Sequence, residues 1–421
     1  MDDRHTLGVL HGSALYVGAL IGPGLLLVPA LAAQHAGASS IIAWAGLLVI
    51  SAPLALTFAA LGVRHPVAGG VSAYVREGLG GEAAAVTGGW FLTAVLLGAP
   101  AVSLIGGYYV AALTGSGTAV ATSVGFAMYG TVLAANVLGL RISAGFQLAL
   151  SSVLIVVMAV AISVALPSRG GDNWHPFAPH GWWAVGTAAN ILVWLFVGWE
   201  AVAQLAGDFG RPEVDLPRAM ALAFAVVSVL YVGLAVATIG VTATGSTSRV
   251  PLADLISVGF GRAGRDATAV LAVALTMGTM NVYLGGAAKL AASLAGEGAL
   301  PRWFGGDAHR SVPRRPLAVI SLVIFALLGA LAAGVGSAED LIRATSALFI
   351  AVYVLALVSA FRILDGAVRS AAGVALVASL VLAGFSEQFL VVPVVAAAGA
   401  LALRRKLRPR TSPAFAKPKH S

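Results

Sequence analysis

The stretch Val17-Gly-Ala-Leu-Ile-Gly-Pro-Gly-Leu-Leu-Leu-Val-Pro29 is almost wholly apolar and carries Gly22-Pro23-Gly24 at its centre. Proline lacks an N–H, and its ring crowds the carbonyl four residues back, here that of Ala19, so a helix must kink or break at this point. The flanking glycines let the backbone unwind and let another molecule approach it closely. In lipid, a broken helix is tolerated only where the freed backbone groups face protein or a water-filled cavity. If this stretch crosses a membrane, its middle is therefore predicted to bind something polar.

The composition is that of a membrane protein. Of 421 residues, 59% are hydrophobic and only 10% are charged, whereas soluble domains carry about 25% charged residues. The chain has no cysteine, which excludes disulfides, thiolate metal sites and cysteine nucleophiles. The short charged start runs directly into the first apolar stretch, so we expect no cleavable signal. The net charge of +8 comes from loops and the tail, so we expect no nucleic-acid partner.

Twelve apolar stretches are candidates for crossing a bilayer, which takes about 20 residues each. They lie near residues 9–34, 40–62, 84–113, 118–138, 143–166, 182–207, 218–242, 267–291, 316–335, 340–361, 369–384 and 387–403. The sequence therefore predicts an all-α polytopic membrane protein, with residues 1–421 forming a single transmembrane domain. An even number of spans puts both chain ends on the same side.

The basic residues predict the orientation. With the N-terminus inside, the inner segments hold twenty of the 25 Lys and Arg residues, and positive charge accumulates on the cytoplasmic side. We therefore expect a multi-pass protein of the cell (plasma or inner) membrane with both termini cytoplasmic. The basic tail 404–421 is expected to lie on anionic lipid of the inner leaflet.

Glu200 is the one acid, of seventeen Asp and Glu, well inside a predicted span; Asp208 lies near the inner end of the same span. A carboxylate there costs about 2.5–3.5 kcal/mol on insertion scales and marks a functional site by default. The alternative is a structural Glu that is bonded to a neighbouring helix.

Gly198 gives the sixth span a weak point at about the same depth as the break in the first span. The two spans run in opposite directions. Corresponding interruptions in two halves of opposite topology are typical of inverted repeats with a midplane binding site. We therefore expect one repeat over about 9–166, a second over about 182–361, and two peripheral helices over about 369–403.

Four separated stretches occur in the order and spacing of a known family. They are Leu20-Ile-Gly-Pro-Gly24; Pro66-Val-Ala-Gly-Gly-Val-Ser-Ala-Tyr74; Phe196-Val-Gly-Trp-Glu-Ala-Val-Ala-Gln204; and Gly296-Glu-Gly-Ala-Leu-Pro-Arg302. Over about residues 8–404 the chain resembles the amino acid–polyamine–organocation (APC) transporter superfamily, most of all its methionine and branched-chain amino-acid exporters. The resemblance implies a LeuT-like 5+5 inverted repeat with broken helices 1 and 6, and secondary active transport by alternating access.

Other classes of membrane protein fit less well. An enzyme would need polar catalytic groups clustered near one interface, and a channel would need polar rings around a pore; the sequence suggests neither.

An amino-acid zwitterion needs an anion site and a cation site a few ångströms apart. Beyond the first break, the N–H groups of Gly24, Leu25 and Leu26 can hold a carboxylate, because a helix start favours anions. The carbonyls before each break, around 19–21 and 193–196, can accept bonds from the ammonium. The predicted substrate-binding residues are Ile21, Gly22, Pro23, Gly24, Leu25, Leu26, Trp194, Phe196, Val197 and Gly198. Many members of the family carry Ser or Thr where Pro23 stands, which implies weaker affinity or a shifted pose here.

The side chains expected around the breaks carry no charge. They are Leu25, Trp194, Phe196 and either Phe349 or Tyr353. A neutral, apolar cargo follows: methionine, leucine, isoleucine or valine, with export expected from the family branch. Uptake, exchange, or a cationic amino-acid or polyamine cargo are the alternatives. Trp194 matches a position where some members of the family place an aromatic gate, although Trp also commonly packs.

We expect no cofactor and no metal site, since the eight histidines lie at span ends or in loops. The coupling ion is expected to be H⁺, carried by Glu200, because burial favours the neutral carboxyl. Na⁺ is the lesser alternative, through Thr276, Thr279 and Asn281, whose ordinary role would be hydrogen bonding between or within helices. The partners are an amino-acid substrate and the lipid bilayer, and the oligomeric state stays open. Residues 66–80 are expected to form a short inner helix, and the outer loop 243–266 to be partly helical.

Overall fold

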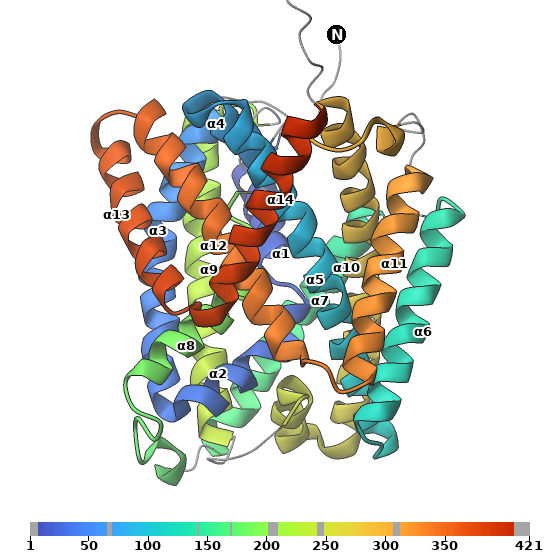
Figure 1. Ribbon diagram of the computed structural model, residues 1–421. Helices are drawn as coiled ribbons and strands as arrows, with labels where there is room; N and C mark the ends of the chain where they lie inside the picture. Colours follow the sequence, from blue (N-terminus) through green and yellow to red (C-terminus); the bar gives the residue numbers. More distant parts are fainter. Residues whose placement is uncertain are drawn as a thin grey trace, which may run out of the picture.

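The computed structural model describes residues 7–64, 70–140, 143–168, 171–200, 209–241, 248–305 and 312–407. Within these ranges the regular structure is helical, apart from one isolated bridge between Leu7 and Phe209. The prediction of an all-α fold is confirmed (Figure 1).

The first five spans follow the predicted order. They are formed by α1 (Val9–Leu20) with η1 (Pro23–Leu26) and α2 (Val28–Ala36), then α3 (Ser40–Arg64), α5 (Gly81–Thr114), α6 (Thr118–Val137) and α7 (Ala144–Ala165). The expected inner helix is α4 (Gly70–Leu79). Short 3₁₀ segments occupy the connections η2 (Gly37–Ser39), η3 (Leu166–Ser168) and η4 (Gly171–Trp174).

The remaining seven spans begin with a second interrupted helix. They are formed by α8 (Trp183–Leu192) with η5 (Val193–Phe196), then α9 (Pro212–Val241), α10 (Pro251–Gly296), α11 (Arg314–Ala332), α12 (Ala338–Ile363), α13 (Gly366–Gly384) and α14 (Val391–Leu407). The segments η7 (Arg302–Gly305) and η8 (Glu387–Leu390) precede α11 and α14.

Length and composition identify the membrane-crossing helices among the residues described. Ten are long and apolar enough to cross a bilayer, and two shorter apolar helices, Val9–Leu20 and Trp183–Phe196, lead into the two breaks. Each of the twelve predicted spans is thus helical over the residues that the structure describes. Helix α9 starts at Pro212, well before the predicted start of its span. Helix α10 consists of two helices joined at a kink at Gly261 (φ 54°, ψ −141°), and the first of them is the helical outer segment expected within 243–266.

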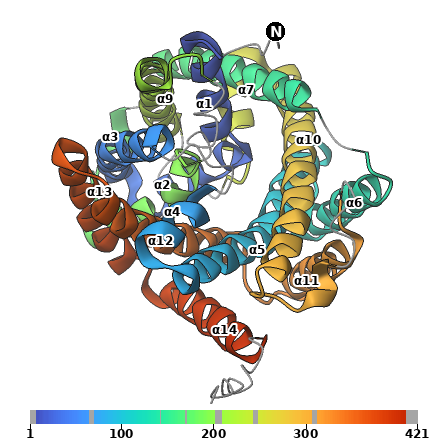
Figure 2. The same ribbon diagram turned by 90° about the horizontal axis from the view of Figure 1, so that it is seen from above.

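The two breaks are packed among the longer helices: η1 contacts α5 and α10, and η5 contacts α8 and α12. Seen from above, α1 lies between α9 and α7, whereas α6, α11, α13 and α14 lie at the rim (Figure 2). Helices α13 and α14 therefore have the peripheral position that the sequence predicted. Figure 1 also shows α4 and the end of α14 at one end of the bundle.

Candidate functional site

The first span breaks at the predicted place. Helix α1 ends at Leu20, and Ile21 (φ −89°, ψ 98°) and Gly22 (φ −130°, ψ −175°) are extended. Pro23 then opens the 3₁₀ turn η1, a position where its missing N–H leaves no hydrogen bond unmade. Helix α2 begins only after Leu27, whose backbone is also non-helical.

The sixth span breaks at Gly198. After η5 the chain is extended at Val197 (φ −81°, ψ 134°), and Gly198 has φ 138°, a conformation that residues with a side chain rarely adopt. A Cβ atom at Gly198 would lie 3.1 Å from the carbonyl oxygen of Ala19. This glycine therefore serves both the turn and the close contact between the two breaks.

The two breaks meet at a second point. A Cβ atom on Gly24 would lie 2.7 Å from Cδ2 of Leu195 and 3.9 Å from the ring of Trp194. Interruptions that are more than 170 positions apart in the sequence thus form one contiguous centre, as the inverted-repeat interpretation requires.

Tyr231 of α9 joins the carbonyls that the two breaks release. Its hydroxyl oxygen lies 3.0 Å from the carbonyl oxygen of Leu20 and 2.8 Å from that of Leu195. A hydroxyl has one proton, so it donates to one of the two carbonyls at a time. The ring is fully buried and packs against Phe196 and Trp44 at centroid distances of 5.1 and 5.3 Å. Sequence reasoning missed Tyr231.

Glu200 lies buried beside the second break, as the sequence predicted. Its Oε2 atom accepts hydrogen bonds from the Gly198 N–H (3.0 Å) and from the Tyr353 hydroxyl of α12 (2.6 Å). The carboxylate therefore holds the glycine turn and ties it to α12. Asp208, the other acid expected in this span, lies outside the described residues.

The first break has two further bonds of its own. The Tyr109 hydroxyl of α5 donates to the carbonyl of Leu26 (2.9 Å), and the Leu25 N–H donates to the carbonyl of Gly22 (3.2 Å). Of the three amides expected to hold a carboxylate, that of Leu25 thus already has an acceptor in this conformation.

The predicted binding residues differ in exposure. Gly22, Trp194 and Val197 are half-buried; the others are fully buried, namely Ile21, Pro23, Gly24, Leu25, Leu26, Phe196 and Gly198. Trp194 lies between Gly24 and Gly98 of α5, with its ring 3.9 Å from a Cβ placed on either glycine.

The three polar residues proposed for sodium on α10 make helix contacts. Thr276 donates to the carbonyl of Ala272 in its own helix (2.7 Å), Thr279 accepts from Gln147 of α7 (3.3 Å), and Asn281 donates to the carbonyl of Leu140 (3.3 Å). These bonds fit the ordinary structural role, and ion coupling through them stays a prediction. Among the residues that the structure describes, no group of three or more His, Asp or Glu could hold a metal ion.

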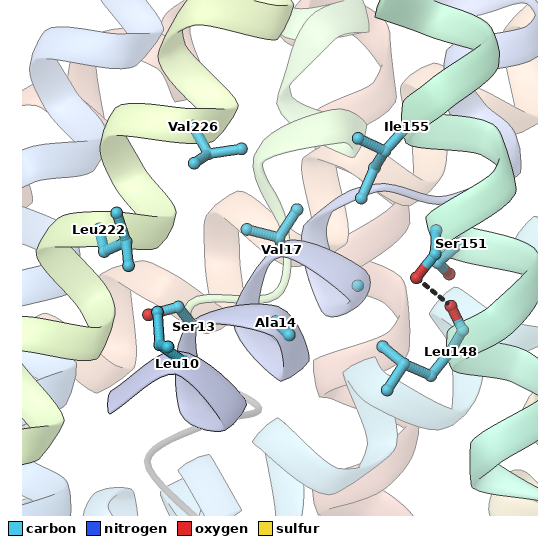
Figure 3. Close-up of a pocket in the computed structure, with 11 residues that line it drawn as sticks. Leu10, Ser13, Ala14, Val17, Leu148, Ser151, Ile155, Leu222 and Val226 are labelled. Carbon is cyan, nitrogen blue, oxygen red and sulfur yellow. Dashed lines mark hydrogen bonds between the residues drawn. The ribbon is translucent and has the colours of Figure 1, made fainter. Parts of the chain in front are cut away.

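A cavity of about 210 Å³ lies beside the half-helix α1. Figure 3 shows its lining, drawn from α1 (Leu10, Ser13, Ala14, Val17), α7 (Leu148, Ser151, Ile155) and α9 (Leu222, Val226). Because this lining is uncharged, it offers no counter-charge to a zwitterion. The cavity is instead open space next to the inner half of the broken helix.

Comparison with known proteins matches nearly the whole chain to amino acid transporters. The Amino acid permease family matches residues 7–402. The sequence is 33% identical over 94% of this chain and 95% of the relative to YecA of Bacillus subtilis (strain 168), named an uncharacterized amino acid permease. It is 29% identical to the L-methionine/branched-chain amino acid exporter YjeH of Escherichia coli (strain K12), over 87% of this chain and 88% of YjeH. It is 26% identical to the branched-chain amino acid permease BcaP of Bacillus subtilis (strain 168), over 56% of this chain and 55% of BcaP.

Proposed function

Because this chain belongs to the amino acid permease family of the APC superfamily, we propose that it carries neutral, apolar L-amino acids by alternating access around the joined breaks. The relatives are permeases and transporters, so the chain is a transporter and not an enzyme. The observation that carries the proposal is the contact of the breaks, Gly198 against Ala19 and Gly24 against Leu195.

The backbone at the breaks suits the two charges of a zwitterion. The start of η1 and α2 offers amide groups and a positive dipole end to the carboxylate. The ammonium would meet the carbonyls of Leu20 and Leu195, in exchange with the hydroxyl of Tyr231, which satisfies only one of them at a time. The substrate thus supplies the hydrogen bonds that the broken helices lack.

The side chains at the breaks favour an apolar cargo. Trp194 and Val197 are the half-buried side chains there, and Leu25 and Phe196 are buried. A cationic cargo would call for a carboxylate free to face it, whereas Glu200 is buried and holds the Gly198 turn and Tyr353 through its Oε2 atom. The printed names of YjeH and BcaP, a methionine/branched-chain exporter and a branched-chain permease, support methionine, leucine, isoleucine and valine. We propose export on the likeness to YjeH.

We also propose that a proton drives the transport, through Glu200. A proton on Oε2 would remove an acceptor from the Gly198 N–H and from Tyr353, and so would loosen the turn at the second break. The bias of basic residues supports a cell-membrane orientation with both chain ends in the cytoplasm.

A flux assay in proteoliposomes tests the proposed cargo. Radiolabelled neutral, basic and acidic amino acids would be compared, together with methionine methyl ester and 3-(methylthio)propylamine, which lack the free carboxylate. We expect saturable transport of methionine and leucine and none of the two analogues. Equal transport of the amine would make the cargo an organic cation and would contradict the proposal.

A further inference from the structure

A second, polar cavity of about 510 Å³ is lined by residues at the end of the bundle opposite α4 (Figure 1). It is formed where the end of α5 and the α5–α6 turn meet residues 248–254 and the part of α10 just after its kink. None of the residues predicted at the breaks lines it. Its polar lining includes Tyr108, Thr118, Ser248, Arg249, Asp254 and Arg265.

Two of the three charges in this cavity neutralise each other. Arg265 lies 3.5 Å from Oδ1 of Asp254, and the Ser248 hydroxyl donates to Oδ2 of the same carboxylate. The Nε atom of Arg265 is buried and has no hydrogen-bond partner among the described residues.

Arg249 supplies the remaining charge. One NH of its guanidinium donates to the Thr118 hydroxyl (3.0 Å), and the group lies over the ring of Tyr108 at 4.8 Å. No carboxylate in the described ranges pairs with it, and residues 242–247, which precede it in the chain, include no acid. The guanidinium is thus held in place by a ring and a hydroxyl while most of its N–H donors stay available.

This arrangement matches one kind of small molecule. A fixed guanidinium binds a carboxylate through two parallel hydrogen bonds. An ionised carboxylate has about four acceptor sites, so Asp254 can also accept from an ammonium beside its bonds to Arg265 and Ser248. Alanines at positions 111, 112 and 121 add uncharged wall to the same cavity.

We propose that this cavity is a second binding site for the amino-acid zwitterion, with its carboxylate on Arg249 and its ammonium towards Asp254. The identity of the ligand rests on the proposed function, whereas the site itself does not involve the breaks.

Equilibrium binding of L-leucine to the purified full chain in a neutral detergent tests the proposal by stoichiometry. We expect two equivalents for the wild type. Arg249→Gln should bind one, or bind the second about 10- to 100-fold more weakly, since it loses a charge-assisted pair. Arg249→Lys, which keeps the charge without the fork, should give an intermediate affinity. Arg262→Gln is the matched control, because Arg262 is exposed and pairs with Asp266 outside the cavity.

The possible outcomes distinguish binding in this cavity from binding at the breaks. One equivalent in both wild type and Arg249→Gln overturns the second site and leaves the proposed function standing. One equivalent that is lost in Arg249→Gln supports the second site and argues against the breaks. No binding to the wild type overturns both. Displacement of the second equivalent by short-chain phosphatidylglycerol, but not by leucine analogues with a free carboxylate, would assign the cavity to a lipid phosphate and overturn the proposal.

Discussion

At the breaks, single residues determine how closely two helices approach. Gly198 combines a φ of 138° with a contact that leaves a Cβ only 3.1 Å from the Ala19 carbonyl. We expect Gly198→Ala to cost about 1–3 kcal/mol of local strain and to abolish transport. Gly130→Ala is the control: this position on α6 has open space and should gain slightly from helix propensity. Thermal unfolding and flux would be measured for both, and an active Gly198→Ala protein would show that the breaks do not need this contact.

Tyr231 can be tested against a tyrosine of similar burial. We expect Tyr231→Phe to destabilise the protein by about 1–3 kcal/mol, because the carbonyls of Leu20 and Leu195 lose their buried donor. Tyr16→Phe should change stability little, since the Tyr16 hydroxyl is buried without a partner in the described structure. Equal melting temperatures for the two variants would contradict the bridging role of Tyr231.

Glu200→Gln separates proton coupling from structure. The amide keeps an acceptor oxygen for Gly198 but cannot take up a proton, so we expect exchange of substrate to continue while a pH gradient no longer drives net transport. Tyr353→Phe is the companion variant, because it removes the other bond to the carboxylate and leaves the proton site intact. Net transport by Glu200→Gln that still follows the pH gradient would remove Glu200 from coupling.

At the scale of single residues, the sequence predicted where the helices break but not which side chains bond to the carbonyls that the breaks release. Gly22-Pro23-Gly24 and Gly198 were visible because proline and glycine act on their own backbone. Tyr231 and Tyr109 were not, because a tyrosine in an apolar span looks the same whether its hydroxyl meets a carbonyl or not. Only the relative register of α9, α5 and the breaks decides this.

Among the elements, the half-helix α1 has a cavity beside it. It is bound to α9, where the Ser13 hydroxyl lies 3.1 Å from the Ala219 carbonyl oxygen, while the cavity of Figure 3 separates it from parts of α7. We expect Ala14→Leu to fill this space, to slow transport at least several-fold by hindering α1, and to leave substrate binding intact. Ala398→Leu, on an exposed position of α14, is the control. Unchanged turnover in Ala14→Leu would mean that α1 does not move into the cavity.

Element boundaries were predicted less well than element existence. Helix α9 starts at Pro212 with Glu213 and Asp215 in its first turn, a start signal in the sequence that the search for apolar residues passed over because this turn is polar. Helix α10 is two helices that meet at a kink, where Gly261 has a positive φ, and the first of them is the helical outer segment that the sequence predicted.

For the whole molecule, hydropathy was sufficient to predict the twelve spans, and the order of the sequence motifs was sufficient to predict the fold. The polar cavity around Arg249 could not be predicted, because it exists only where the ends of α5, α6 and α10 meet. The division into repeats over about 9–166 and 182–361 stays a prediction, as does the orientation.

Orientation has a direct test in a chain that has no cysteine of its own. A membrane-impermeant maleimide applied to intact cells should label Ala333→Cys, in the exposed α11–α12 turn, and should not label Ala367→Cys, at the opposite end of α12. Both should react after permeabilisation. The reverse pattern would place the chain ends outside.

The central claim is that the amino acid lies at the joined breaks, and substrate protection of one thiol tests it most directly. Val197 is half-buried at the second break, and Val197→Cys would be the chain's only thiol. We predict that saturating L-methionine slows its reaction with a small thiol reagent at least tenfold, whereas methionine methyl ester does not. An unchanged rate with bound methionine would contradict the account.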